Sequence, residues 1–147
     1  ETLCQILKRK KLEAPPRFFV RVPSRTKECG YTAMSQLLKC CTGHLPTAVV
    51  AASDDIAQGA LRALYEKNLR VPDDLSLVGI DDIPSARMMV PALTTLRLPV
   101  REMVRAAFKM VTERKAGRAV REVIIKPRLV IRESCARPSS YGRSASK

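Results

Sequence analysis

Aromatic side chains and histidine are scarce in this sequence. Tryptophan is absent, phenylalanine and tyrosine occur three times each, and the one histidine is His44. Proteins that bind single-stranded nucleic acid stack bases on aromatic side chains, so the composition lacks the signature of that class. No nucleophile and base are arranged as a recognisable catalytic set, and we expect His44 to lie solvated in a loop.

Motifs for metal, phosphate and membrane binding are also missing. The five cysteines are odd in number and lack C-x-x-C spacing, which predicts neither a disulfide framework nor a zinc site. Reduced thiols fit a cytoplasmic protein best. No apolar run is long enough to span a bilayer, and neither a glycine-rich phosphate loop nor a signal peptide is visible. We therefore expect no cofactor, no metal and no membrane partner. Because the sequence begins with Glu1 rather than methionine, we expect it to be part of a longer chain.

Acidic residues are few, with 14 Asp and Glu against 27 Lys and Arg, which gives a net charge of +13. Such an excess is compatible with a nucleic acid partner. The basic residues are nevertheless spread along the chain, with only residues 8–11 forming a block, and no helix-turn-helix or zinc-finger pattern is present. We expect these residues not to bind DNA directly.

Apolar runs and helical patterns alternate along the chain. With 46% hydrophobic and 28% charged residues, the sequence is typical of a globular domain. Residues 47–52 and 75–80 are continuous apolar runs, as expected of buried parallel strands, and residues 54–67 between them have helical periodicity. Ser53 and Asp81 follow the two runs directly. Because ligands bind at the carboxyl ends of parallel strands, we expect both side chains to lie at a binding site.

The remaining pattern predicts one α/β domain with a doubly wound, mostly parallel sheet. Residues 1–134 form this domain, and residues 135–147, rich in Ser and Arg, are predicted to be a flexible tail. We expect helices at residues 1–11, 27–41 and 100–115, the last covering a sheet face, and strands at residues 17–22 and 93–97. Two β-like pieces, 122–126 and 128–132, are separated by Pro127, which favours an edge strand or a crossover.

The helix at residues 54–67 has more apolar surface than one sheet can cover. Its apolar and small side chains span roughly 200° of the helix circumference, whereas an apolar stripe of about 100° suffices. Leu61 and Tyr65, flanked by Gln58 and Arg62, are left over. Either a neighbouring helix of the same chain or a second subunit covers them.

The block PTAVVAASDDIAQGALRALYEKNLRVPDDLSLVGIDDIP, followed by PALTTLRLPVREMVRAAF and PRLVIRES, resembles the LacI/GalR family of transcription regulators. The resemblance runs from about residue 27 to residue 134 and concerns the C-terminal subdomain of their effector-binding core. It implies a Rossmann-like subdomain of a type I periplasmic-binding-protein-like core. The implied partners are a small-molecule effector, such as a sugar or related metabolite, and a second copy of the chain. DNA would be bound only through a headpiece that this sequence does not contain.

Several residues take expected roles from this resemblance. Asp81 matches the acid that contacts the effector, although a carboxylate there could instead cap the next short segment. Ser53 stands where the family often has Asn, and Asp54 matches a near-standard acid that we assign to capping the following helix. Arg25 replaces an aromatic residue that stacks on the ligand in several members, and Leu98 replaces a usual Gln. Arg25 therefore either binds an anionic group of a different effector or is a solvated surface residue.

The family also dimerises through the face that carries the spare apolar surface. The expected interface residues are Gln58, Leu61, Arg62, Tyr65, Met88 and Met89, the two methionines lying in an exposed-looking segment. A solute-binding protein for import would share the fold, but the unpaired cysteines and the spare helix face argue against it. An enzyme using Asp54–Asp55 and Asp81–Asp82 is not expected, because adjacent carboxylates tend to diverge.

Overall fold

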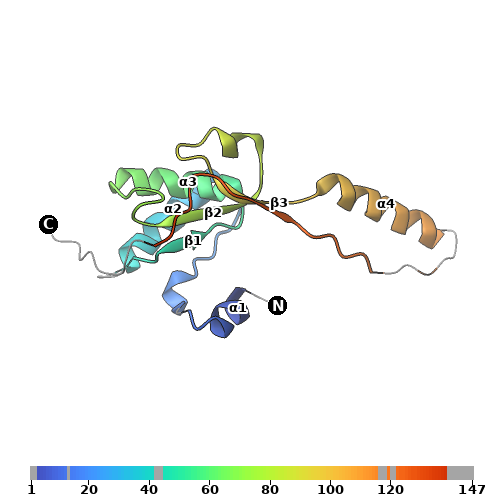
Figure 1. Cartoon of the computed structure of the whole chain (residues 1–147), viewed down its shortest axis with the longest axis horizontal. Coiled ribbons are helices and arrows are strands. Elements are labelled where there is room, and N and C mark those ends of the chain that lie inside the picture. The colour runs from blue at the N-terminus through green and yellow to red at the C-terminus, as the bar shows by residue number, and fades with distance from the viewer. Residues whose placement is uncertain (1–2, 13, 42–44, 116–118, 120–121, 139–147) are drawn as a thin grey trace.

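The computed structural model describes residues 3–12, 14–41, 45–115, 119 and 122–138. His44 and the predicted tail beyond residue 138 lie outside these residues. Figure 1 shows the elements, which follow in chain order. They are α1 (Leu3–Arg9), the 3-10 helix η1 (Pro16–Phe18), α2 (Lys27–Cys40), β1 (Ala48–Val50), α3 (Asp54–Glu66), β2 (Ser76–Asp81), the 3-10 helix η2 (Pro84–Arg87), β3 (Thr94–Arg97), α4 (Val100–Lys115) and β4 (Arg128–Val130). No helix of the described part of the chain has both the length and the apolar character to cross a bilayer.

The four strands form one sheet in the order β1-β2-β3-β4. The first three strands are parallel, with Val49 beside Leu77 and Ile80 beside Leu96. β4 returns antiparallel to β3 at the edge of the sheet, directly after Pro127. A proline is tolerated there because an edge strand leaves part of its backbone unpaired. The predicted α/β class with a mostly parallel sheet is confirmed.

The core lies between α3 and the sheet, and α2 packs on α3 (Figure 1). Ala57, Leu64 and Leu77 are fully buried in it. The two helices cross at Gly30 and Gly59. A Cβ atom at Gly59 would lie 1.8 Å from the Lys27 carbonyl oxygen, and one at Gly30 would lie 2.2 Å from the Ile56 carbonyl oxygen. The backbones are therefore in direct contact, and no side chain fits between them.

The position of α4 differs from the prediction. Its apolar periodicity led us to expect that it covers a sheet face, but none of its residues is buried. Figure 1 shows α4 beyond the end of β3, well away from the sheet. The short Leu98-Pro99 connection directs the chain past the sheet edge instead of back over it. An amphipathic pattern predicts that a face will be covered, but it does not identify what covers it.

Two predicted strands are absent from the described residues. Residues 17–22 were expected to be extended, but Pro16 opens the 3-10 helix η1 and residues 19–22 pair with no strand. Val20 and Val22 are half-buried and pack against the core, so the alternating pattern reflects burial without a hydrogen-bonded neighbour. Residues 122–127 are likewise unpaired, and only Arg128–Val130 joins the sheet.

The segment after β4 runs back along the start of the sheet. Ser134 is buried and joins β2 to β3: its hydroxyl donates to the Leu77 carbonyl at 2.6 Å and accepts from the Thr94 amide at 2.8 Å. The Ala136 amide donates to the Ser76 hydroxyl at 3.2 Å. These bonds fix the described end of the chain to the strand edge opposite the candidate site.

Candidate functional site

Ser53, Asp81 and Arg25 all lie at the carboxyl edge of the sheet. Ser53 closely follows β1, Asp81 is the last residue of β2, and Arg25 is in the loop that precedes α2. Because β1 and β2 are parallel neighbours, their ends meet at one edge. The topology thus places Ser53 and Asp81 at the same edge of the sheet, and the charge of Arg25 acts on Asp81.

Ser53 is the N-cap of α3. Its backbone is extended, with φ −159°, and its hydroxyl accepts the Ile56 amide at 3.3 Å. The residue is only 3% exposed. Its hydroxyl oxygen therefore uses one acceptor site for the helix, which leaves its proton and its second lone pair for other contacts.

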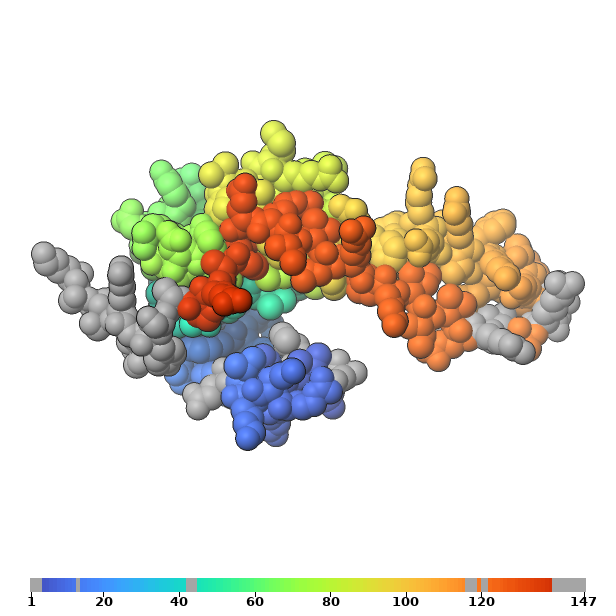
Figure 2. Space-filling view, in the orientation of Figure 1, coloured from blue at the N-terminus to red at the C-terminus, as the bar shows by residue number. Residues whose placement is uncertain are grey.

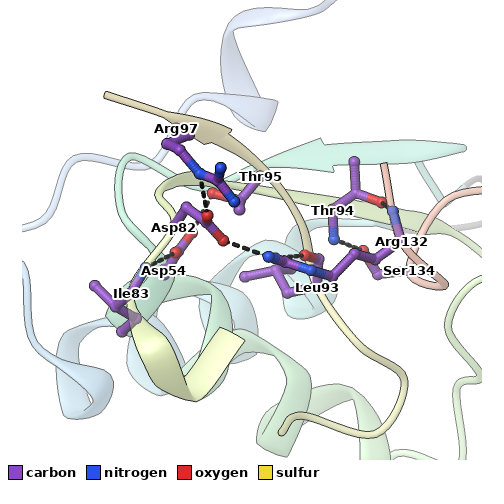
Figure 3. Close-up of polar contacts among 9 residues, drawn as sticks. All are labelled: Asp54, Asp82, Ile83, Leu93, Thr94, Thr95, Arg97, Arg132 and Ser134. Carbon is purple, nitrogen blue, oxygen red and sulfur yellow. Dashed lines mark hydrogen bonds and ion pairs between the residues drawn. The ribbon is translucent and has the colours of Figure 1, made fainter. Parts of the chain in front are cut away.

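Asp54 does not cap the helix, contrary to the prediction. Its fully buried carboxylate accepts the Thr95 hydroxyl at 2.5 Å and the Ile83 amide at 2.9 Å (Figure 3). It joins the start of α3 to β3 and to the segment after β2. The run Ser53-Asp54-Asp55 offers three capping residues, and only the backbone geometry selects Ser53.

Asp81 is half-buried, and the pKa of its carboxyl is raised. Burial raises the pKa of its carboxyl, the negative charge of Asp54 raises it further, and the positive charge of Arg25 opposes both. No residue in the described part of the chain donates a hydrogen bond to this carboxylate. It does not cap η2, which begins after Ile83 without a side-chain cap. Asp81 is thus a carboxylate at a strand end with unused acceptor capacity.

Asp82 is a structural residue that the sequence did not identify. Its side chain is 2% exposed and accepts Arg97 Nε at 2.5 Å and the guanidinium of Arg132, as Figure 3 shows. Burial raises the pKa of Asp82, but the hydrogen bonds from Arg132 and Arg97 outweigh it and hold that pKa below its usual range. Arg132 also donates to the Leu93 carbonyl at 2.7 Å.

The two adjacent aspartates point into different surroundings because both have left-handed backbones, with φ 112° at Asp81 and 58° at Asp82. This geometry ends β2 sharply and separates the two carboxylates. Part of the Asp82 ion pair could have been expected from the sequence, because Arg97 ends the next strand, β3, in register with Asp81. The contribution of Arg132 depends on the return of the chain and has no local signature.

The spare surface of α3 borders a hollow of about 440 Å³. It is lined by Gln58, Leu61, Arg62 and Tyr65, by Leu69, Arg70 and Val71, and by Met89, Val90 and Pro91. Tyr65 is 74% exposed, so α2 does not cover it. Met88 is 82% exposed, but Met89 is buried at 8%, contrary to its exposed-looking sequence. The Gln58 side-chain oxygen is buried and has no hydrogen-bond partner among the described residues.

Comparisons with known proteins agree with this geometry. Residues 4–135 match the family of periplasmic binding protein-like domains. The HTH-type transcriptional repressor PurR of Escherichia coli is 41% identical over 111 residues, which are 74% of this chain and 32% of PurR. The chain therefore spans about a third of the length of this curated relative.

Two solved structures are similar in fold. A LacI family transcriptional regulator from Mycobacterium smegmatis superposes with a TM-score of 0.83 at 32% identity, over 92% of this chain and 51% of its own. A sugar-binding LacI family regulator from Escherichia coli, complexed with phosphate, gives 0.81 at 27% identity, over 92% and 48%.

The match over residues 4–135, the repressor relative and the similar fold lead to one conclusion. This chain belongs to the periplasmic binding protein-like domain family, among the effector-binding domains of LacI/GalR-type regulators.

Proposed function

We propose that this chain is the effector-sensing and dimerising part of a LacI-type transcription regulator. The observation that carries the proposal is Asp81, a strand-end carboxylate with a raised pKa and no hydrogen-bond donor in the described residues. Such a carboxylate is suited to accept hydrogen bonds from hydroxyl or amine groups of a small molecule. DNA binding would belong to a headpiece outside this sequence, and the chain would catalyse no reaction.

The presence of Arg25 beside the site favours an effector that carries an anionic group. Arg25 is exposed and its charge acts to lower the pKa of Asp81, which supports a ligand that contacts both residues. A guanidinium binds phosphate or carboxylate through two parallel hydrogen bonds, which an aromatic residue at this position could not do. A sugar or related metabolite that carries an acidic group satisfies both Arg25 and Asp81.

The test is calorimetric titration of the complete regulator with neutral sugars and with their phosphorylated or carboxylated forms. We expect the anionic forms to bind more tightly, and Asp81→Asn and Arg25→Gln each to weaken that binding at least about tenfold, the equivalent of 1.4 kcal/mol. Asp73→Asn, at an exposed turn, is the control. Equal affinity of the parent and the Asp81→Asn protein for every ligand that binds would refute the site.

We further propose that the α3 hollow, together with the exposed Met88 next to it in the chain, is the dimer interface. The hollow contributes Gln58, Leu61, Arg62, Tyr65 and Met89. A two-fold axis would bring this surface against its own copy. The exposed ring of Tyr65 supports the proposal, because a second subunit could cover it.

Analytical ultracentrifugation tests this interface. The parent chain should sediment as a dimer and Leu61→Arg as a monomer, because a charge would be placed in the centre of the apolar contact. Gln36→Arg adds the same charge on an exposed part of α2 and should remain dimeric. If all three proteins sediment alike, α3 is not the interface.

A further inference from the structure

Glu66 is an acidic residue at the end of a helix where its charge opposes the helix dipole. It is the last residue of α3, and the last turn of this helix holds no basic residue. The carboxyl end of a helix carries partial negative charge, so a carboxylate there is unfavourable. Glu66 also follows Arg62 by four residues, which is the less favourable order for an ion pair along a helix. The helix itself therefore gains little from this acid.

The Glu66 carboxylate has partners on two helices. Its Oε2 atom accepts the hydroxyl of Tyr31, on α2, at 2.6 Å, and its Oε1 atom accepts Arg62 Nε, on α3, at 2.7 Å. The hydrogen bond from Tyr31 and then that from Arg62 hold the pKa of Glu66 below its usual range, so the carboxylate stays charged at neutral pH. Arg62 is thus held by a carboxylate that α2 also holds.

The arginine bound to Glu66 belongs to the α3 hollow. Arg62 lines this hollow with Tyr65, and its guanidinium lies 6.0 Å from the centre of the Tyr65 ring. Arginine and tyrosine are among the residue types that carry most binding energy where protein surfaces meet. Figure 2 shows α3, in green, and the yellow-green segment after β2 at the upper edge of the molecule, away from α1 in blue.

A two-fold axis at the hollow would bring like charges together. Arg62 and Arg70 both line the hollow, so a second copy would add the same two guanidinium groups. Like charges that face each other across an interface oppose association. Each arginine is balanced within its own subunit, Arg62 by Glu66 and Arg70 by Asp74, whose carboxylate accepts Nε at 3.2 Å and Nη2 at 3.1 Å. A surface balanced in this way can meet its own copy without net repulsion.

We propose that Glu66 is a positioning residue of the dimer interface, which fixes the direction of Arg62 and cancels its charge so that two α3 surfaces can associate. This role rests on the proposed α3 interface, and the partner is a second copy of the chain. The acid at the end of α3 then serves the contact between subunits, where its cost to the helix is offset.

Sedimentation equilibrium at two salt concentrations tests this role. Glu66→Gln keeps the volume and an acceptor for Tyr31 but leaves Arg62 without its counter-charge. At about 50 mM salt, we expect the dimer of this variant to have a dissociation constant at least about tenfold higher than that of the parent. At about 1 M salt, where the screening length is about 3 Å, the two constants should agree within about threefold.

A double variant and a matched control separate charge from structure. The protein with both Arg62→Gln and Glu66→Gln has no unpaired guanidinium at this position and should dimerise at least about fivefold more tightly than Glu66→Gln at low salt. Glu113→Gln removes the acid of another ion pair with the same spacing, with Lys109 on α4, which is orange in Figure 2. It should leave the dissociation constant within about twofold of the parent.

The outcomes distinguish the role of Glu66 from the interface itself. A dimeric parent with an equally tight Glu66→Gln dimer at low salt would overturn the role of Glu66 and leave the α3 interface in place. A defect of Glu66→Gln that neither salt nor the second substitution relieves would also contradict this role, because a residue that only maintains the fold behaves in that way. A monomeric parent would overturn the α3 interface and the role of Glu66 with it.

Discussion

Two neighbouring aspartates show how residue roles in this protein depend on surroundings rather than on type. Asp81 lies beside other carboxylates and Arg25, with a raised pKa, whereas Asp82 lies between two guanidinium groups, with a lowered pKa. Their position after an apolar run predicts a ligand-binding edge. That position did not separate Asp81, the proposed ligand contact, from Asp82, because the difference arises from Arg97 and Arg132, which are distant in sequence.

We expect Asp82→Asn to destabilise the chain by about 3–5 kcal/mol at pH 7. The substitution keeps the volume but leaves the Arg132 side chain, which is 12% exposed, without its counter-charge. Urea unfolding followed by circular dichroism measures the loss. Asp73→Asn, which removes an exposed ion pair with Arg70, should cost less than about 1 kcal/mol. Similar losses for the two variants would show that the buried ion pair stabilises the fold no more than the exposed one.

Acid should remove the contribution of Asp82 in a defined range. Because its pKa is lowered in the folded chain, this carboxylate contributes stability above the unfolded value of about 3.9. That stability is lost as the pH falls through the lower folded value. The parent and Asp82→Asn should therefore converge in stability toward strongly acidic pH, as measured by urea midpoints at pH 2, 4 and 7.

Asp81→Asn should change the free energy of unfolding in the direction opposite to that of Asp82→Asn. A raised pKa means that the folded chain binds a proton more readily than the unfolded chain, so ionisation of Asp81 lowers stability as the pH rises above about 4. The variant should unfold at a higher urea concentration than the parent at pH 7 and at the same concentration at pH 3. A parent that is the more stable at pH 7 would contradict this electrostatic account.

At the scale of elements, the packing of α2 on α3 depends on direct backbone contact at Gly30 and Gly59. Gly59→Ala would ordinarily stabilise a helix by about 1 kcal/mol. Here the new Cβ would lie 1.8 Å from the Lys27 carbonyl oxygen, so the helices must separate, and we expect a net loss of about 1–3 kcal/mol. Thermal unfolding measures it. Thr32→Ala, on the exposed side of α2, should be neutral or slightly stabilising. A more stable Gly59→Ala protein would show that the crossing is loose.

Element prediction succeeded where the covering partner is part of this chain. α3 was predicted within one residue at its C-terminal end, because its apolar face packs against β2. Residues 17–22 and 122–126 have β-like patterns but find no neighbouring strand among the described residues, so the same pattern gives no strand. For α4 the length was correct and the position was not.

At the scale of the whole molecule, the candidate site is an open edge of the sheet. Small-molecule sites commonly enclose about 70–90% of the ligand surface, whereas a sheet edge covers one side of it. We therefore expect residues 1–147 alone to bind the effector on the order of 100-fold more weakly than the complete regulator, a difference of about 2.7 kcal/mol. Calorimetry of the two proteins with the same ligand measures the ratio. Equal affinities would show that this chain holds the whole site.

The sequence alone determined the alternation of strands and helices, the parallel core and the edge at which Ser53 and Asp81 meet, because these follow from local periodicity and from the rule for strand ends. The tertiary structure decided which group caps α3, which aspartate is buried between Arg97 and Arg132, and where α4 lies. Each of these depends on contacts between residues far apart in the chain, and local patterns do not specify such contacts.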